Sequence, residues 1–323
     1  MSPADGDIDL SVPVDMMSLP GGTFLMGSND HYPEERPAHK VQVGAFAIDR
    51  HAVTNRQFAR FVAETGHVTL AEKPVDPADY PGVDPALLVP SSVVFVTPPG
   101  RVDLRNTHNW WQYLAGADWR HPRGADSSLE GLEDHPVVQV GYDDALAYAQ
   151  WAGKDLPTEA EWEFAARGGR DSGEFAWGDE LVPGGRYMAN TWQGEFPWDN
   201  QVLDGYAWTS PVGSFPPNDY GLYDMIGNVW EWTSDWYQDH GQLQGKPCCT
   251  LDNPRGAARD ASVDSRASGP RTPRRVMKGG SHVCAPNYCR RYRPAARMAQ
   301  PIDTATCHLG FRCVVRPGQA RHA

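Results

Sequence analysis

Regular secondary structure is confined to a few short stretches of this sequence, and long irregular connections join them. The chain has 32 glycines and 28 prolines in 323 residues, nearly a fifth of its length. Both residue types interrupt helices and strands, so the sequence predicts an α+β fold with a large irregular component. An apolar fraction of 40%, with 12 tryptophans, is enough for a substantial core. No internal repeat divides the chain, and we expect a single domain.

Three helices have recognisable start and stop signals. A capping box marks the start of the first and the third, and a glycine marks the end of each. The expected helices run from Thr54 (paired with Gln57) to Gly66, from Asp143 to Gly153, and from Thr158 (paired with Glu161) to Gly168. Alternating apolar residues and turn signals predict strands within Leu19–Ser28, His39–Thr54 and Leu309–Val315, the last burying Cys313.

Charge and hydropathy exclude several classes of partner. The formal net charge of −12 argues against general nucleic-acid binding. No run approaches the roughly 18 apolar residues of a membrane span. Residues 1–18 are acidic and lack the apolar core of a secretory signal, so we expect a disordered lead-in and a cytoplasmic protein with reduced thiols. The domain is expected over residues 19–316, followed by a tail at 317–323.

Two cysteines, Cys284 and Cys289, lie in the only strongly basic segment. Residues 265–302 contain nine Lys or Arg and no acid, so the rest of the chain carries about −21. Nearby cations stabilise thiolate over thiol. A disulfide, half of a metal site and a reactive pair all remain possible, although a reducing compartment weakens the first. His282 or His308 could complete a zinc site, whereas two thiolates alone suit copper(I).

Another cysteine pair, Cys248–Cys249, falls in residues 237–275, which we expect to form an extended surface loop. Adjacent thiols could bind a metal. Loop cysteines without a special role are the simpler explanation.

Six motifs between Leu19 and Val315 together resemble the formylglycine-generating enzyme family, also called sulfatase-modifying factors, in its actinobacterial type. They are LPGGTFLMGS, AVTNRQFARFV, HPVVQVGYDDALAYAQWAGKDLPTEAEWEFAARGG, GNVWEWTSDWY, KGGSHVCAPNYCRRYRPAAR and HLGFRC. The segments LPTEAEWE and GNVWEW mark only the broader superfamily. The cysteine pair is more specific, because it is the reactive centre of true formylglycine-generating enzymes.

The resemblance implies a fold, an activity and a cofactor. The fold would be one C-type-lectin-like domain of low regular structure. The activity would be oxidation of the cysteine in a Cys-x-Pro-x-Arg segment of an unfolded sulfatase to Cα-formylglycine, with O2 as oxidant. Copper(I) would be held by Cys284 and Cys289.

Other residues around the thiols have two possible roles each. Ser281 could hydrogen-bond substrate or oxygen, or be a turn hydroxyl, and Trp230 could wall the pocket or belong to the core. The arginines nearby could offset thiolate charge or form structural ion pairs; they are Arg290, Arg291, Arg293 and Arg297.

The resemblance also implies two structural calcium sites. The first would use the side chains of Asn190 and Asp204 and the carbonyls of Thr191 and Tyr206. The second would use the side chains of Asp224 and Glu231 and the carbonyls of Gly227 and Val229. Calcium takes six to eight oxygen ligands of these kinds, although the same residues also form ordinary turns.

Secreted relatives carry disulfides that this chain cannot form. Cys313 matches one bridge position, but its partner position is Ala149, and a partner position of another bridge is Ala166. Both substitutions agree with a cytoplasmic protein.

Two alternatives come from other functional classes. A catalytically silent superfamily member that binds peptide or glycan would lack the cysteine pair. A non-haem iron sulfoxide synthase would need a histidine-rich iron motif, and the chain has no His-x3-His-x-Glu. The acid that would receive the substrate arginine is not identifiable from sequence.

Overall fold

The computed structural model describes residues 15–78, 82–84, 88–242, 250–266 and 271–318. Within them, the helices are α1 (Asn55–Thr65), α2 (Tyr142–Trp151) and α3 (Glu159–Arg167). The strands are β1 (Met16–Leu19), β2 (Gly22–Met26), β3 (His39–Val43), β4 (Phe46–Asp49), β5 (Ser91–Phe95), β6 (Trp111–Ala115), β7 (Trp230–Trp236), β8 (Leu251–Asp252), β9 (Arg274–Lys278), β10 (Arg297–Pro301), β11 (Leu309–Gly310) and β12 (Val314–Val315). The predicted α+β class with low regular structure is confirmed.

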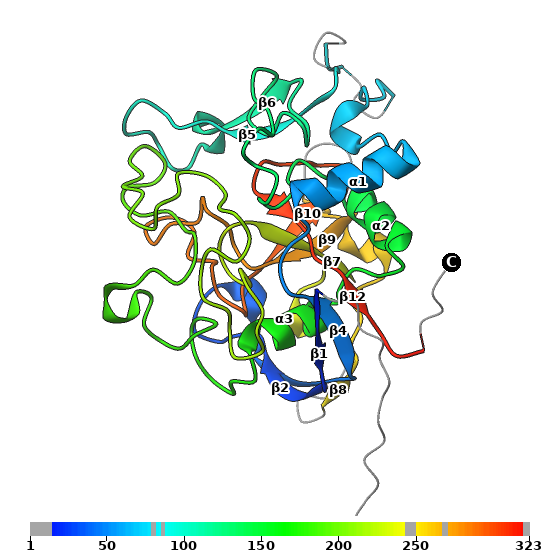
Figure 1. Ribbon diagram of the computed structural model, residues 1–323, viewed down its shortest axis with the longest axis vertical. Coiled ribbons are helices and arrows are strands. Elements are labelled where there is room, and N and C mark those ends of the chain that lie inside the picture. Colours follow the sequence, from blue (N-terminus) through cyan, green and yellow to red (C-terminus); the bar gives the residue numbers. More distant parts are fainter. Residues whose placement is uncertain (1–14, 79–81, 85–87, 243–249, 267–270, 319–323) are drawn as a thin grey trace, which may run out of the picture.

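Small sheets replace any single large one. The described strands pair in the orders β1-β4-β12, β10-β9-β7-β11, β2-β3-β8 and β5-β6. The sheet containing β7 and β9 lies in the middle of the molecule, between the β5–β6 hairpin and the sheets formed by the N-terminal strands (Figure 1). Helix α3 packs against β7 and β9. Long irregular connections surround this centre (Figure 1).

The helix signals are confirmed where the caps are explicit. Thr54 and Gln57 form the capping box of α1, and Gly66 ends it in the left-handed conformation at φ 69°. Thr158 and Glu161 do the same for α3, which Gly168 ends. Helix α2 begins one residue earlier than predicted, because the side chain of Asp144 accepts a hydrogen bond from the Gly141 N–H and caps the first turn.

The ends of the domain differ from the prediction. The lead-in expected over residues 1–18 is too long, because β1 pairs with β4 and buries Met16 and Leu19. The strand expected over 309–315 divides into β11, which pairs with β7, and β12, which pairs with β4. The chain changes sheet between them.

The region 237–275 is less irregular than expected, since β8 lies within it and pairs in parallel with β3. Cys248–Cys249 lies outside the described residues. No helix among the described residues is long and apolar enough to cross a membrane.

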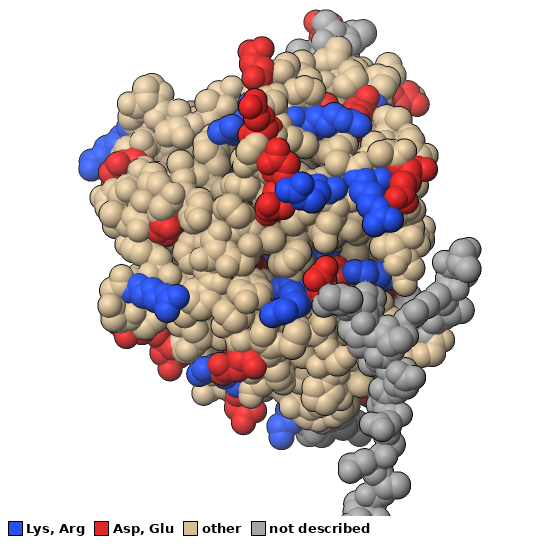
Figure 2. Space-filling view, in the orientation of Figure 1, with Lys and Arg blue, Asp and Glu red and all other residues tan. Residues whose placement is uncertain are grey.

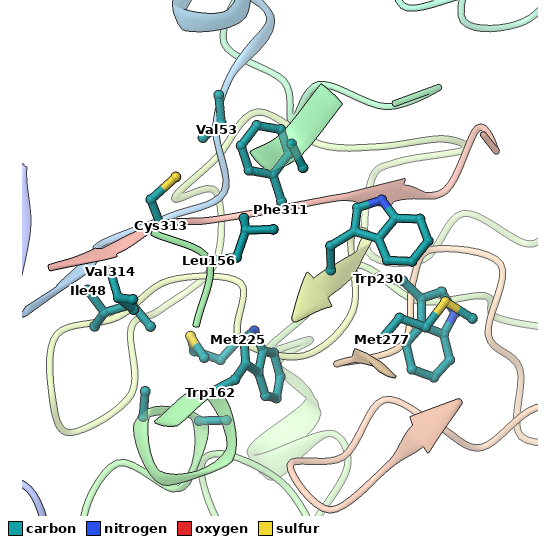
Figure 3. Close-up of a cluster of buried hydrophobic side chains, with 14 of the residues drawn as sticks. Ile48, Val53, Leu156, Trp162, Met225, Trp230, Met277, Phe311, Cys313 and Val314 are labelled. Atoms are coloured by element: carbon teal, nitrogen blue, oxygen red, sulfur yellow. The ribbon is translucent and has the colours of Figure 1, made fainter. Parts of the chain in front are cut away.

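The largest hydrophobic core joins the helices to the sheets other than β5-β6, and a second cluster packs around β5 and β6. Figure 3 shows Trp230, Phe311 and Cys313 in the largest core, with Trp162 of α3. Cys313 is a free thiol with no exposed surface. Ala149 and Ala166 belong to the same core.

Candidate active site and metal-binding residues

The thiol loop, residues 281–289, follows directly from the central strand β9. Gly279 and Gly280 make the turn at positive φ (99° and 71°). A Cβ on Gly280 would lie 2.7 Å from the Arg291 carbonyl oxygen and the Tyr292 nitrogen, so a larger residue would push the loop away from the returning chain. The two glycines therefore allow the chain to fold back against Arg291 and Tyr292.

The loop brings the two thiols into contact. The Cys284 N–H donates to the Ser281 carbonyl and the Cys289 N–H to the Ala285 carbonyl, both at 2.9 Å. The two Sγ atoms lie 3.4 Å apart. A disulfide would bring them to about 2.0 Å, so Cys284 and Cys289 are free thiols. Cys284 is buried and Cys289 is half-buried.

Of the two additional residues predicted at the site, Ser281 lies beside the thiols. It has no exposed surface; its N–H points at the Cys284 Sγ at 3.4 Å, and its Oγ is 4.0 Å from that sulfur. Trp230 is 2% exposed and belongs to the core cluster that also contains Cys284. Its role as a pocket wall stays a prediction.

The two thiols differ in acidity. A hydrogen bond from Cys284 lowers the pKa of Cys289 to about 7, with further help from the Arg291 guanidinium, whose NH1 lies 3.6 Å from the sulfur. Burial raises the pKa of Cys284, as does its donation to Cys289. Cys289 therefore ionises first, and Cys284 donates to the resulting thiolate.

Among the four arginines, Arg291 is the one with a described thiol contact. It also pairs with Glu34 at 2.6 Å. The others bind carboxylates: Arg290 binds Glu174, Arg293 binds Glu35, and Arg297 binds Glu159. Arg293 and Arg297 are almost completely buried. Both sequence-based explanations thus hold, each for different arginines. The face in Figure 2 shows basic and acidic side chains interspersed.

The acids that cover the thiol loop were not identified from sequence. They lie in residues 32–35, where the short helix η1 (Pro33–Glu35) follows Tyr32. The Tyr32 hydroxyl accepts a hydrogen bond from the Arg290 N–H at 3.0 Å, and the Arg291 guanidinium lies 3.8 Å from the Tyr32 ring centroid. The acidic character of HYPEERP was a signal, but nothing in the sequence pairs it with a segment some 258 residues away.

The zinc alternative lacks ligands. His282 donates from Nδ1 to the Asn228 carbonyl at 2.8 Å. The ring of His308 stacks on Trp111, and its Nδ1 lies 2.9 Å from the Thr306 hydroxyl. In the ranges that the structure describes, no three His, Cys, Asp or Glu side chains gather in a metal-binding group.

The residues of the first predicted calcium site lie together. The carboxylate of Asp204 accepts from the N–H groups of Thr191 (2.9 Å) and Tyr206 (3.0 Å). Asn190 is 1% exposed, and its Oδ1 is buried without a described partner. Gln193, which was not predicted, donates to Asp204 at 2.7 Å. A buried oxygen without a described partner, one residue before the Thr191 N–H that binds the Asp204 carboxylate, fits an oxygen-ligated cation.

The second predicted site fits in part. Asp224 has φ 53°, and its Oδ1 is buried without a described partner. Burial raises the pKa of Asp224 to about 6. Glu231, however, forms a bidentate pair with Arg312 (2.7 and 2.8 Å) and accepts from the Trp162 indole. Its charge is already balanced by Arg312, which the sequence analysis did not single out.

Comparison with known proteins assigns this arrangement to a family. The model of the sulfatase-modifying factor enzyme 1-like domain matches residues 10–317. A formylglycine-generating enzyme of Mycobacterium tuberculosis is 54% identical over 303 residues, covering 94% of this chain and 98% of that protein. The chain belongs to the formylglycine-generating enzyme family. The predictions of the family and of an enzyme within it are confirmed.

Two further relatives and one solved structure are also similar to this chain along most of its length. A formylglycine-generating enzyme of Thermomonospora curvata is 45% identical, covering 94% of this chain and 93% of that protein. A mouse protein named inactive C-alpha-formylglycine-generating enzyme 2 is 38% identical, covering 95% and 87%. The structure of PvdO from Pseudomonas aeruginosa aligns with a TM-score of 0.60 at 25% identity, covering 93% and 94%. A relative that is named as inactive is thus similar along nearly the whole chain. Activity must therefore be inferred from the geometry of the thiols as well as from overall similarity.

Proposed function

We propose that this chain converts a cysteine in unfolded sulfatases to Cα-formylglycine, with O2 as oxidant and copper(I) held by Cys284 and Cys289. The observation that carries the proposal is the pair of free thiols 3.4 Å apart, in which the pKa of Cys289 is lowered by a hydrogen bond from Cys284 and by Arg291. The substrate would present its cysteine in a Cys-x-Pro-x-Arg segment. The protein is proposed to act in the cytoplasm.

The donor set fits copper(I). The two sulfurs are close enough to contact one ion, and soft thiolates are the ligands that copper(I) prefers. When bound, copper(I) supplies electron transfer to oxygen. Cys284, whose pKa is raised in the free protein, would have to lose its thiol proton to act as a ligand.

The chain's own residues have distinct roles at this site. Arg291 offsets the negative charge that thiolates accumulate, and Glu34 holds its guanidinium in place. Cys289 is half-buried, so an incoming peptide can reach it, whereas Cys284 anchors the site from within. Ser281 lies within reach of the Cys284 sulfur and is the candidate to orient a substrate thiol or oxygen.

Calcium is proposed as a structural cofactor. Asn190 and Asp204 would bind the first ion with the carbonyls of Thr191 and Tyr206. Asp224 and the carbonyls of Gly227 and Val229 would bind the second, and Glu231 would contribute only an oxygen already shared with Arg312.

The direct test is turnover of a Leu-Cys-Thr-Pro-Ser-Arg peptide in air by copper-loaded and copper-stripped protein. Mass spectrometry would follow conversion of the thiol to the aldehyde. We expect copper-dependent formylglycine, and loss of turnover in Cys284→Ser and Cys289→Ser. Cys307→Ser is the matched control, because that thiol is buried elsewhere and bonded to the Phe95 N–H. Full activity in either site variant would contradict the copper centre.

A further inference from the structure

We propose that Asn228 is a positioning residue that fixes the thiol loop against two neighbouring segments. The inference rests on the proposed function only in treating residues 281–289 as the reactive loop. Asn228 is 1% exposed and lies between Gly227 and Val229, two residues before the start of β7. It contacts neither thiol, so its effect would pass through His282.

The carbonyl oxygen of Asn228 accepts two hydrogen bonds from the thiol loop. It accepts the backbone N–H of His282 at 2.9 Å and the ring Nδ1 of the same residue at 2.8 Å. Because a carbonyl oxygen only accepts, Nδ1 carries the proton. Both the main chain and the side chain of the residue after Ser281 are therefore held by one atom.

The rest of Asn228 is bonded to two other segments. Its backbone N–H donates to the Asn190 carbonyl at 2.8 Å. Its side chain forms two bonds with the Ser210 backbone: Oδ1 accepts from the N–H at 3.0 Å and Nδ2 donates to the carbonyl at 3.1 Å. The backbone N–H of Trp192, close to Asn190, donates to the Cys284 carbonyl at 3.0 Å. Asn228 therefore holds the loop at His282, and the segment 190–192, to which Asn228 is bonded, holds it at Cys284.

The conformation of Asn228 explains the residue type. Its φ of 56° lies in the left-handed region, which few side chains other than Asn and Asp tolerate. Glycine would accept this φ but would lose both bonds to Ser210. Alanine would lose those bonds and add backbone strain. Asparagine satisfies both requirements.

Loss of this support should separate the two sulfurs. Cys289 has a contact with the Arg291 guanidinium that does not involve Asn228. Cys284 depends on the segment that Asn228 holds. A metal site needs its ligands fixed within a fraction of an ångström, and outer partners of ligands typically contribute about 10- to 100-fold in affinity.

The test compares Asn228→Ala, Asn228→Gly, Asn228→Asp and His282→Phe with Asn253→Ala. Asn253 is the matched control, because it also has a positive φ (40°) but lies on the surface beside Gly44. Copper(I) affinity would be measured by competition with a chromophoric chelator, and the redox midpoint of the Cys284–Cys289 pair in metal-free protein. Peptide turnover would be resolved into kcat and KM.

We expect Asn228→Ala and His282→Phe to weaken copper(I) binding by about tenfold or more. We expect both to shift the thiol–disulfide midpoint and to lower kcat, with KM for the peptide within about twofold. Asn228→Gly should be intermediate, and Asn228→Asp, which retains the φ and one acceptor, should recover part of the loss. Asn253→Ala should match the wild type.

Wild-type copper affinity and thiol midpoint in folded Asn228→Gly and His282→Phe would overturn the proposal, even if Asn228→Ala fails to fold. A lower melting temperature without any change at the thiols would also overturn it, because that is the signature of a merely structural residue. The midpoint does not depend on formylglycine formation. An inactive wild type would therefore refute the proposed function while this test of Asn228 still gives its answer.

Discussion

Substitution of Glu163 tests how much its buried ion pair with Lys278, which precedes the thiol loop, stabilises the fold. Glu163 has no exposed surface and accepts from Lys278 Nζ (2.9 Å), Arg167 NH2 (2.7 Å) and the Gly27 N–H (2.8 Å). Lys278 is the last residue of β9, directly before the turn into the loop. Burial alone would raise the pKa of Glu163, but the charges of Lys278 and Arg167 outweigh it and lower the pKa from 4.5 to about 2.

The pKa gives the magnitude. A pKa that is lower in the folded state means that the group stabilises the fold above the unfolded pKa of 4.5, and that this contribution is lost as pH falls through about 2. At about 1.4 kcal/mol per tenfold change in proton affinity, the full contribution is about 3 kcal/mol. Less than half of it remains at about pH 3. Among the carboxylates of the described residues, removing Glu163 leaves Glu159, at 3.6 Å, as the partner of the buried Lys278 ammonium.

We therefore expect Glu163→Gln to lower the free energy of unfolding by about 3 kcal/mol or more at pH 7. The difference from wild type should narrow by about 2 kcal/mol at pH 3. Urea unfolding at pH 7, 5 and 3 measures both values. The control is Glu64→Gln, which removes an exposed carboxylate paired with Arg60. A Glu163→Gln difference that stays constant with pH would refute the reasoning, because the carboxylate charge would then contribute nothing.

Three further predictions concern pH and metals. Burial raises the pKa of Asp235 to about 6, so its ionisation lowers the free energy of unfolding as pH rises from about 4 to about 6. Asp235→Asn should remove that decline when the free energy of unfolding in urea is measured against pH. The same decline in the variant would contradict this role of Asp235. A calcium chelator should lower the melting temperature of the wild type more than that of Asp204→Ala, in which only the second proposed calcium site remains; equal shifts in both would exclude the first site. Arg291→Met should raise the pKa of Cys289 above about 7, so the midpoint of the iodoacetamide alkylation profile of Cys289 should move to higher pH. A midpoint that does not move would mean that the hydrogen bond from Cys284 alone lowers the pKa of Cys289.

The parts of the fold that local chemistry determines were predictable. The capping boxes of α1 and α3 need only Thr and Gln or Glu three residues apart, and the structure forms them as expected. These boxes depend on neighbours in the chain, so the sequence contains all the information that is needed. The five-residue separation of Cys284 and Cys289 allows their contact, but Asn228 and Trp192, which are distant in the sequence, hold the loop at His282 and Cys284.

The remaining features depend on partners distant in the sequence. Leu309–Val315 has the pattern of one strand, but its two ends pair with β7 and β4, and Arg312 between them turns to Glu231. The basic segment was evident, whereas its pairing with Glu34, Glu35, Glu159 and Glu174 was not. Asn228 had no signal beyond its motif, because its importance comes from a left-handed φ and from contacts with Asn190, Ser210 and His282.

The ion pairs between residues 34–35 and residues 291–293 have a consequence for biosynthesis. They join positions 257 and 258 residues apart, and contacts of such separation form late in folding. During translation, the N-terminal segment emerges long before the thiols that it will cover. The acidic residues 34–35 and the basic residues 291–293 therefore meet only once nearly all of this domain has left the ribosome. A shorter nascent chain lacks these ion pairs, and deletion of either segment should leave the other without its charge partner.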